Sequence, residues 1–378
     1  MAVTGNKGEW SELYTFLRLL ADGKLYAADG HLNKIDSIYF PIIKIIREET
    51  IGKRKDYFTG SEITISIDGN EIKIPAHYFS EEAEHLLKQI KSVSGHSFSS
   101  EKTEKFMNII SVECLEDKSR DKADIIVQIH DIQTGFSPEV GFSIKSKLGK
   151  PATLFNASKA SNFTYEIIGD KDKLNFIAAN LEKIQGVEIP NSINKSNGIK
   201  QIIQEIENLG CDLSYNDVDD RFCSNLMMSD SQMPIIVAEL LIAYYSGQSK
   251  ARVESALEKV ILKNPLSVNS DKASIFYIHK IKSLLCDMAL GMVATLEWYG
   301  TDEASGGYIV VKEDGEIVAY HILKRDLFKD YLFLNAKFEA PQRFDSLPPS
   351  KKKGFDYGYI YEKDSKLFIK LNLQIRFI

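Results

Sequence analysis

The spacing of hydrophobic residues in the first hundred positions predicts helices and one hairpin. Residues 9–21, 34–49 and 80–93 repeat apolar side chains every three or four positions, which is the period of an amphipathic helix. The segment EITISIDGNEIKIP at 62–75 instead alternates Ile with polar residues on both sides of Asp68-Gly69. Alternation around an Asp-Gly pair is typical of a β-hairpin, so we expect two antiparallel strands there.

The remainder of the chain predicts strands, then helices, then strands again. Residues 123–130 and 139–146 are two short apolar strands joined by a loop. From about 170 to 297 the apolar residues follow a helical period almost throughout. The segments 307–323 and 357–378 alternate once more around turn residues and predict two further hairpins.

This order predicts an α+β protein organised in three regions. We expect a mixed sheet core flanked by helices in residues 1–168, a helical scaffold in 169–297 and a β-rich region in 298–378. The chain has 378 residues, of which 44% are hydrophobic, and this is enough apolar material for a sizeable core.

The cysteines and the apolar stretches favour a cytoplasmic protein. The cysteines Cys114, Cys211, Cys223 and Cys286 are scattered and form no C-x-x-C motif, which indicates reduced thiols and neither a disulfide framework nor a zinc site. The first residues contain no apolar segment of the signal-peptide kind. The longest apolar stretch, 233–245, is interrupted by Glu239 and is too short to span a bilayer.

The net charge of −6 argues against nucleic-acid binding by the chain as a whole, so any such surface has to be local. Residues 140–165 contain four lysines and no Asp or Glu. Small hydrogen-bonding side chains accompany the lysines, a composition that suits contacts with phosphates and is also found in ordinary solvated loops. The candidate DNA contacts in this stretch are Lys147, Lys150, Asn156, Ser158, Lys159 and Asn162.

A possible catalytic group lies on the two strands at 123–130 and 139–146. If residue 130 faces residue 140 in an antiparallel hairpin, Asp124 lies beside Lys145, and Ser143 shares the face of Lys145. A carboxylate can hold Mg²⁺, and a lysine can orient the nucleophile or stabilise the charge that develops on a phosphate. An Asp and a Lys on neighbouring strands also commonly form a simple surface ion pair, so both interpretations stay open.

Two glutamates of the first predicted helix are further candidates. Glu9 falls inside the apolar arc of this helix, and Glu12 falls at its edge. A carboxylate turned toward a core needs a partner, and a metal ion would supply one. Acidic residues are also favoured in the first turn of a helix by its dipole, which is an alternative explanation for either residue.

The residues around Asp124 resemble the core of the PD-(D/E)XK nuclease superfamily. Asp124 matches the first acid, and Ser143-Ile144-Lys145 stands in the place of the (D/E)XK element. The stretch GNKGEWSE at 5–12 resembles the G-x-x-x-E helix element of the same superfamily, with either Glu9 or Glu12 as its acid. The resemblance implies a PD-(D/E)XK-like mixed sheet core and a catalytic role for the region 1–168.

The whole chain further resembles the HpaII-type restriction endonucleases. The similar motifs are TGNKGEWSELY, DGKLYAAD, GFSIKSKLG, LFNASKASNF, GGYIVVKEDGEIVAYH and LNLQIRF, in this order along nearly the full length. The family implies a type II restriction enzyme that cuts both strands of duplex DNA with Mg²⁺ at a short palindrome, CCGG for its namesake. It also implies a homodimer on the palindromic site and a companion DNA methyltransferase.

Ser143 is the main departure from the superfamily pattern, because it occupies the usual acidic position. A serine cannot supply a charged metal ligand, so the second carboxylate has to come from Glu12, Glu9 or Glu139, in that order of preference. Glu139 is the least suitable, since it lies four residues along the same strand, about 13 Å away at strand rise. The expected metal ligands are therefore Asp124 and Glu12.

Base reading is expected from residues outside the catalytic hairpin. Guanines in the major groove favour bidentate contacts with Arg or Lys, and the C-terminal region supplies Arg343, Lys352 and Arg376. Two other functions remain open. The serine at 143 is compatible with an inactive DNA-binding protein on the same fold, and the chemistry also fits a repair or junction nuclease of looser specificity.

Overall fold

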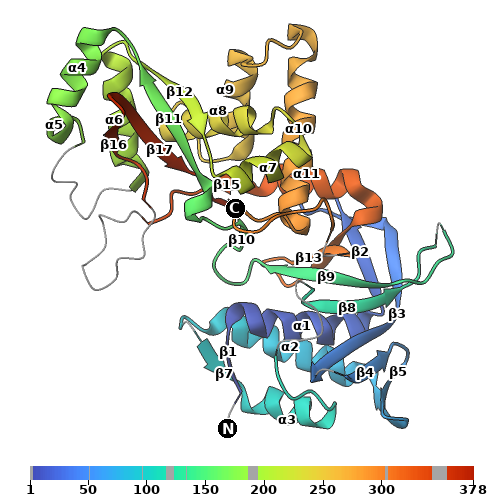
Figure 1. Ribbon diagram of the computed structural model, residues 1–378. Coiled ribbons are helices and arrows are strands. Elements are labelled where there is room, and N and C mark those ends of the chain that lie inside the picture. The colour runs from blue at the N-terminus through green and yellow to red at the C-terminus, as the bar shows by residue number, and fades with distance from the viewer. Residues whose placement is uncertain are drawn as a thin grey trace. The chain divides into compact units, whose positions relative to one another are not determined.

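A computed structural model describes residues 3–50, 52–95, 97–115, 123–132, 134–185, 195–302, 305–342 and 356–378 (Figure 1). The chain forms two compact units, and each combines segments that are distant in the sequence. Unit 1 consists of Met1–Ala152 and Asp302–Tyr331, and unit 2 of Thr153–Thr301 and Leu332–Ile378. The three consecutive regions expected from the sequence therefore do not coincide with the units, because the C-terminal strands are shared between them.

Unit 1 contains a nine-stranded mixed sheet in the order β2-β14-β13-β9-β8-β3-β4-β5-β6. Its strands are β2 (Lys24–Ala28), β3 (Lys34–Thr50), β4 (Lys53–Phe58), β5 (Glu62–Ile67), β6 (Asn70–Pro75), β8 (Ile125–Ile129), β9 (Glu139–Ser146), β13 (Gly307–Val311) and β14 (Ile317–His321). The expected hairpins β5–β6 and β13–β14 are confirmed. Strand β13 runs parallel to β9, so a C-terminal hairpin extends a sheet made mostly of N-terminal strands.

The helix predicted over residues 34–49 is wrong, because this segment is the 17-residue strand β3. Its isoleucines favour an extended backbone, and Pro41 is disfavoured inside a helix. The first half of β3 pairs with β2 and the second half with β8 and β4. The additional β2–β3 pairing joins strands that are otherwise far apart in the sheet order.

The β8–β9 hairpin is confirmed, but its register differs from the expected one. Ile125 pairs with Phe142 and Val127 with Val140, so Asp124 comes opposite Ser143 and not beside Lys145. The connecting loop folds back earlier than expected, since the amide of Asp131 donates to the carbonyl of Phe136 (2.9 Å). The tighter loop shifts the pairing by three residues.

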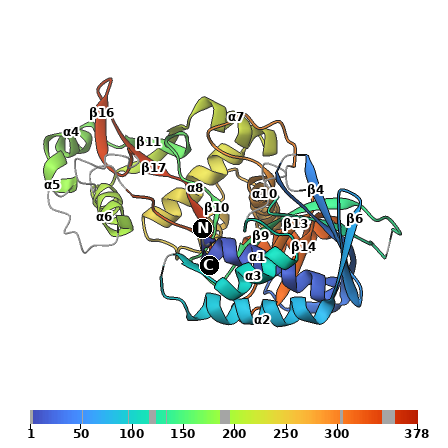
Figure 2. The ribbon, with the colours of Figure 1, turned by 90° about the horizontal axis from the view of Figure 1, so that it is seen from below.

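The helices of unit 1 are α1 (Lys7–Asp22), α2 (Ala76–Ser92) and α3 (Glu101–Ile109), which lie close together in Figure 2. Short strands β1 (Thr4–Asn6) and β7 (Ser97–Ser99) pair beside them. The predicted helices at 9–21 and 80–93 are confirmed with slightly earlier starts. The core joins the apolar faces of α1 and α2 to one face of the sheet, where Phe142, Ile144 and Ile309 are buried.

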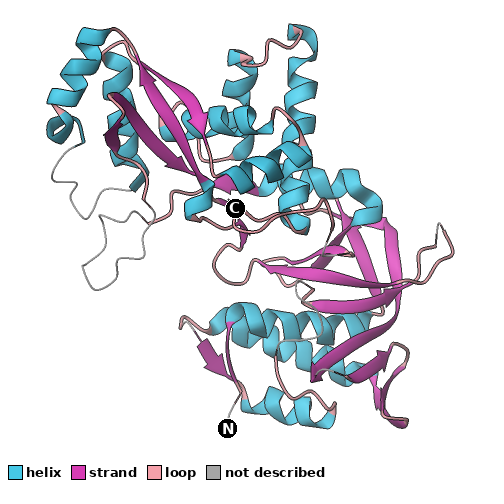
Figure 3. Cartoon of the chain, viewed as in Figure 1, coloured by secondary structure: helices cyan, strands magenta, loops and turns pink. Residues whose placement is uncertain are grey.

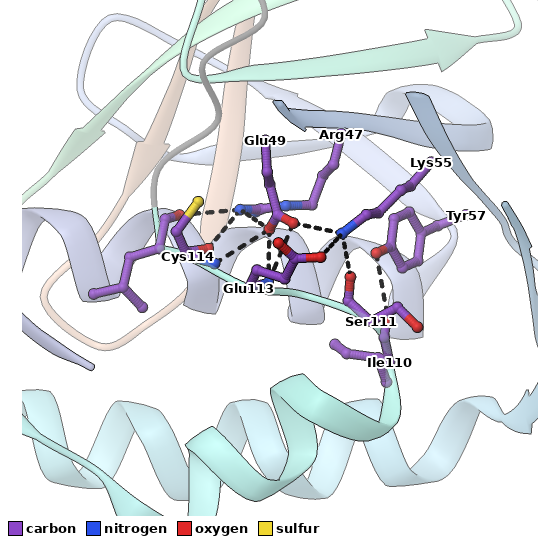
Figure 4. Close-up of polar contacts among 9 residues, drawn as sticks. Arg47, Glu49, Lys55, Tyr57, Ile110, Ser111, Glu113 and Cys114 are labelled. Carbon is purple, nitrogen blue, oxygen red and sulfur yellow. Dashed lines mark hydrogen bonds and ion pairs between the residues drawn. The ribbon is translucent and has the colours of Figure 1, made fainter. Parts of the chain in front are cut away.

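A buried ionic network in unit 1 fastens the segment after α3 to strands β3 and β4 (Figure 4). The carboxylate of Glu49 pairs with Lys55 (2.6 Å) and Arg47 (3.2 Å), and all three residues are at most 7% exposed. Lys55 Nζ donates to the carbonyl of Ser111 (2.7 Å), and Arg47 donates to that of Cys114 (2.8 Å). The network thus satisfies backbone groups that would otherwise be buried without partners.

Unit 2 combines helices with two smaller sheets (Figure 3). One sheet has the order β12-β11-β17-β16 and the other β10-β18-β15. These strands are β10 (Thr153–Phe155), β11 (Asn162–Ile168), β12 (Asp212–Asp217), β15 (Ala336–Phe338), β16 (Ile360–Lys363), β17 (Lys366–Asn372) and β18 (Ile375–Phe377). The predicted β16–β17 hairpin is confirmed.

The helical period predicted over 170–297 is largely confirmed, although β12 interrupts it. The helices are α4 (Lys171–Ala179), α5 (Leu181–Gln185), α6 (Lys195–Asn208), α7 (Asp220–Ser229), α8 (Met233–Tyr245), α9 (Val253–Lys263) and α10 (Ser270–Leu290), and α11 (Arg325–Asn335) follows later. In the described segments no single helix is long and apolar enough to cross a membrane. The bent pair α7 and α8 together passes that test by length and composition.

Candidate active site

A continuous chain of hydrogen bonds connects Lys145, Ser143 and Asp124 at one end of the β8–β9 hairpin. Lys145 Nζ donates to Ser143 Oγ (2.8 Å), and Ser143 Oγ donates to Asp124 Oδ2 (3.0 Å). The backbone amide of Ile144 donates to the same carboxylate oxygen at 2.6 Å. The expected convergence of the three side chains is present, but the serine mediates it, because the observed register places Ser143 between the two charged groups.

The amine of Lys145 is shielded from solvent and lies among opposite charges. Burial lowers the pKa of Lys145, and the negative charges of Asp124 and Glu12 oppose this effect. The amine also lies 5.0 Å from the centre of the Tyr308 ring, a contact between a cation and an aromatic face. A lysine held in this way can place positive charge beside a bound phosphate.

Helix α1 brings Glu12 to this group. Ser146, directly after Lys145, donates through its hydroxyl to Ser11 Oγ (2.9 Å), and Ser11 donates to the carbonyl of Lys7 (2.6 Å). These bonds fasten the first turns of α1 to the end of β9. Glu12 follows Ser11, is half-buried and acts electrostatically on Lys145. Of the three candidate second carboxylates, Glu12 is therefore the one that the structure couples to the lysine.

Glu9 has a different role, because it caps the start of α1. Its carboxylate accepts hydrogen bonds from the backbone amide of Asn6 (2.9 Å) and from the Asn6 side chain (2.5 Å). The Asn6 side chain in turn accepts from the amides of Gly8 and Glu9, which completes a capping box. Glu9 is therefore explained by the alternative interpretation, an acidic residue that stabilises the first turn of a helix. The charges that act on Lys145 are those of Asp124 and Glu12.

Glu139 is engaged at the other end of β9. Its carboxylate contacts Arg54 (2.6 Å) and Lys44 (3.3 Å). The hydrogen bond from Arg54 holds the pKa of Glu139 below its ordinary value. This ion-pair cluster explains the residue without any catalytic role.

The oxygen ligands near Lys145 can be compared with those that Mg²⁺ requires. Among the residues that the structure describes, no three or more His, Cys, Asp or Glu side chains are grouped to hold a metal ion. Asp124 and Glu12 offer two carboxylates, which are hard oxygen ligands. Mg²⁺ is commonly bound by one or two carboxylates together with water and substrate phosphate, so this pair fits a substrate-completed site and not an all-protein cage.

Comparisons with known proteins identify the family of this chain. The family model described as HpaII restriction endonuclease matches residues 6–377. The chain belongs to the HpaII restriction endonuclease family. A curated relative, the Type II restriction enzyme HpaII of Haemophilus parainfluenzae, is 39% identical over 380 residues, which cover 99% of both chains. No solved structure matches the chain with significance. The protein is therefore a type II restriction endonuclease, an enzyme that binds and cuts DNA.

In this HpaII-family enzyme, the basic candidates that follow the group of Asp124, Ser143 and Lys145 along the chain lie in unit 1. Lys150 is exposed, and Lys147 is half-buried with its backbone amide bonded to the carbonyl of Val311 (2.9 Å). Both lie in the segment that follows the last residue of β9, Ser146. Lys7 at the start of α1 is a neighbour of this turn, since a Cβ at Gly149 would lie 3.4 Å from Lys7 Cβ.

Unit 2 of this family member contains four further DNA-contact candidates from the stretch 140–165. Two of them are exposed, and two are hydrogen-bonded inside the unit. Asn156 and Lys159 are exposed. Ser158 caps the short helix η1 (Lys159–Ser161) through a hydrogen bond from the Ser161 amide (3.2 Å). Asn162 is 8% exposed and donates to the carbonyl of Asp356 (3.0 Å). These contacts favour structural roles for Ser158 and Asn162, because the groups expected to meet DNA are bonded inside the unit.

The C-terminal basic candidates are only partly described. Arg376 lies on β18 and pairs with the carboxylate of Glu339. Arg343 and Lys352 lie outside the described residues and stay predictions.

The sequence patterns did not indicate that Tyr308 belongs to the candidate site. Tyr308 and Ser143 are register partners in the parallel β9–β13 pair, although they lie far apart along the chain. Strand alternation alone cannot reveal which distant strand will lie beside β9. Only the pairing of β13 with β9 shows that this tyrosine belongs to the surroundings of Lys145.

Proposed function

We propose that this restriction endonuclease hydrolyses phosphodiester bonds in both strands of duplex DNA at a short palindrome, with Mg²⁺ as cofactor. The observation that carries the proposal is the hydrogen-bonded chain from Lys145 through Ser143 to Asp124, with Glu12 electrostatically coupled to it. CCGG is the first candidate for the palindrome, because the family resemblance implies it.

Asp124 and Glu12 would hold the cation in this proposal. The ion would activate a water molecule and screen the phosphate when bound. The hydrogen bonds from Ser143 and the Ile144 amide both reach Asp124 Oδ2, and they fix the orientation of the carboxylate. Asp124 would therefore need little reorganisation to bind a ligand.

Lys145 would face the reacting phosphate. Its ammonium would stabilise negative charge that develops in the transition state and would orient the attacking water. Ser143 cannot act as a charged ligand in place of the usual acid. Its hydroxyl instead holds the carboxylate and the amine at a fixed separation, which would preserve the geometry of the superfamily motif without its second acid.

The sheet supports a PD-(D/E)XK-like core as part of the same proposal. Strands β8 and β9 are antiparallel, Asp124 directly precedes β8, and Lys145 lies on β9. Strand β13 runs parallel to β9, and α1 brings an acidic residue to the end of β9. A palindrome cut in both strands further favours a homodimer with two-fold symmetry. Protection of the host DNA would require a companion methyltransferase for the same site.

The proposed specificity and cofactor can be tested on one plasmid of known sequence. We expect discrete fragments with Mg²⁺, no fragments with excess EDTA, and both ends of every break mapped to one palindrome. Cleavage confined to branched DNA, or breaks without a common sequence, would favour a repair or junction nuclease. DNA binding without any break would favour an inactive protein on the same fold.

A further inference from the structure

We propose that Tyr308 is a positioning residue for Lys145, holding the lysine ammonium in its reactive orientation against the face of an aromatic ring. The inference rests on the catalytic role proposed for Lys145. The centre of the Tyr308 ring lies 5.0 Å from Lys145 Nζ, and Tyr308 is 3% exposed. The aromatic contact and the hydrogen bond to Ser143 Oγ therefore act on the same amine.

The pairing of β9 with β13 fixes the position of this ring. Tyr308 is the register partner of Ser143, and Val310 that of Lys145, in the parallel ladder. Since side chains of directly paired residues point to the same face, Tyr308, Ser143 and Lys145 share one face of the sheet. Val140, Phe142 and Ile144 point to the other face and enter the core.

Two glycines before Tyr308 permit the close approach of these strands. The amide of Gly306 donates to the carbonyl of Gly141 (2.8 Å), and a Cβ at Gly306 would lie 2.8 Å from that same oxygen. Gly307 has a φ of +99°, and a Cβ there would overlap the carbonyl oxygen of Tyr320. A larger residue at either position would push β13 away from its neighbours and take the ring with it.

The ring is also fixed from the side of α11. Tyr308 and Phe328 form an edge-to-face pair with centroids 5.1 Å apart and an interplanar angle of 66°. Phe328 is fully buried, so the pair is packed and the ring has little freedom to move.

This arrangement meets two requirements of a catalytic lysine. A lysine side chain has four rotatable bonds, and contacts with the ring and with Ser143 restrict the amine to one orientation. Burial of the amine disfavours its charged form, whereas the negative face of the ring favours it. Loss of the ring should therefore reduce both the alignment of the amine and the fraction that is charged at alkaline pH.

The test compares Tyr308→Phe, Tyr308→Leu and the control Tyr57→Leu under single-turnover conditions with saturating enzyme. Tyr57 is a fully buried tyrosine of the same unit, whose hydroxyl donates to the carbonyl of Ile110. We expect Tyr308→Phe to retain the rate within about threefold and Tyr308→Leu to lose about tenfold or more, with DNA affinity unchanged. In Tyr308→Leu the alkaline limb of the pH–rate profile should move to lower pH, and in Tyr57→Leu it should not move.

A fluorination series keeps the test decisive if Tyr308→Leu fails to fold. Phenylalanine, trifluorophenylalanine and pentafluorophenylalanine at position 308 retain the ring shape while weakening its negative face. We expect the cleavage rate to fall stepwise along this series. A flat series, or a Tyr308→Leu enzyme with the wild-type rate and pH profile, would overturn the inference. If Lys145→Ala also cut at the wild-type rate, the catalytic role proposed for Lys145 would itself fail, and the two failures are thus distinguishable.

Discussion

At the scale of single residues, Ser143 carries the most specific prediction. Its hydroxyl accepts from Lys145 and donates to Asp124, so Ser143→Ala removes the bridge and leaves both charged groups in place. Hydrogen bonds to charged groups contribute about 1.5–3 kcal/mol, which corresponds to a fall of about 10- to 160-fold in the single-turnover cleavage rate.

Ser137→Ala is the matched control for this variant, since Ser137 contacts His130 at the other end of the same hairpin (3.0 Å). Its cleavage rate should stay within about threefold of wild type. Equal rates for Ser143→Ala and wild-type enzyme would show that the bridge has no part in catalysis.

His321 predicts a pH dependence of folding stability. The ring is 2% exposed between Phe40 and Phe142, and burial lowers the pKa of His321 to about 4. The unfolded chain takes up this proton near pH 6.5, so the folded state loses stability as the pH falls from about 6.5 toward 4. Between pH 7 and 4.5 the loss should be about 2–3 kcal/mol.

Urea unfolding at both pH values can isolate this contribution. In His321→Gln the free energy of unfolding should change with pH by about 2–3 kcal/mol less than in wild type. His77→Gln, a substitution at an exposed histidine of the same unit, should retain the wild-type pH dependence. The account of His321 is wrong if the two variants behave alike.

At the scale of elements, the ionic network around Glu49 predicts a large loss in the free energy of unfolding when this one glutamate is replaced by the uncharged glutamine. Glu49→Gln removes the buried counter-charge of Arg47 and Lys55, and breaking a buried pair in this way costs about 3–5 kcal/mol. Glu113→Gln removes a carboxylate whose side chain is 75% exposed and which also contacts Lys55, and it should cost at most about 1 kcal/mol. Equal shifts of the two urea midpoints would contradict a buried structural role for the network.

The elements also show where sequence patterns succeed and fail. The hairpins with Asp-Gly or Asp-Ser turns are predictable, because their register follows from local residues. Strand β3 is not, since its dense isoleucines fit a helical period and an extended strand equally well. The β8–β9 register was missed by three residues because the fold of its loop, and not the strand pattern, determines it.

At the scale of the whole molecule, local motifs predicted part of the candidate site. Asp124, Ser143 and Lys145 lie near one another in the sequence pattern of one hairpin, and the structure brings them together. The preference for Glu12 over Glu9 depends on how α1 packs against β9, and the contribution of Tyr308 depends on a strand from the far end of the chain. Tertiary pairings of this kind leave no periodic signal.

The central claim is that Lys145 and its partners form the endonuclease centre. The most direct measurement is single-turnover cleavage of a duplex containing the mapped site by Lys145→Ala, with DNA affinity measured in parallel. Lys312→Ala is the matched control, because Lys312 directly follows β13 and its amine pairs with Glu316 (2.5 Å). The account predicts a loss of about 100- to 1,000-fold or more in the cleavage rate for Lys145→Ala, with unchanged affinity and a wild-type rate for the control. Cleavage by Lys145→Ala at the wild-type rate would contradict it.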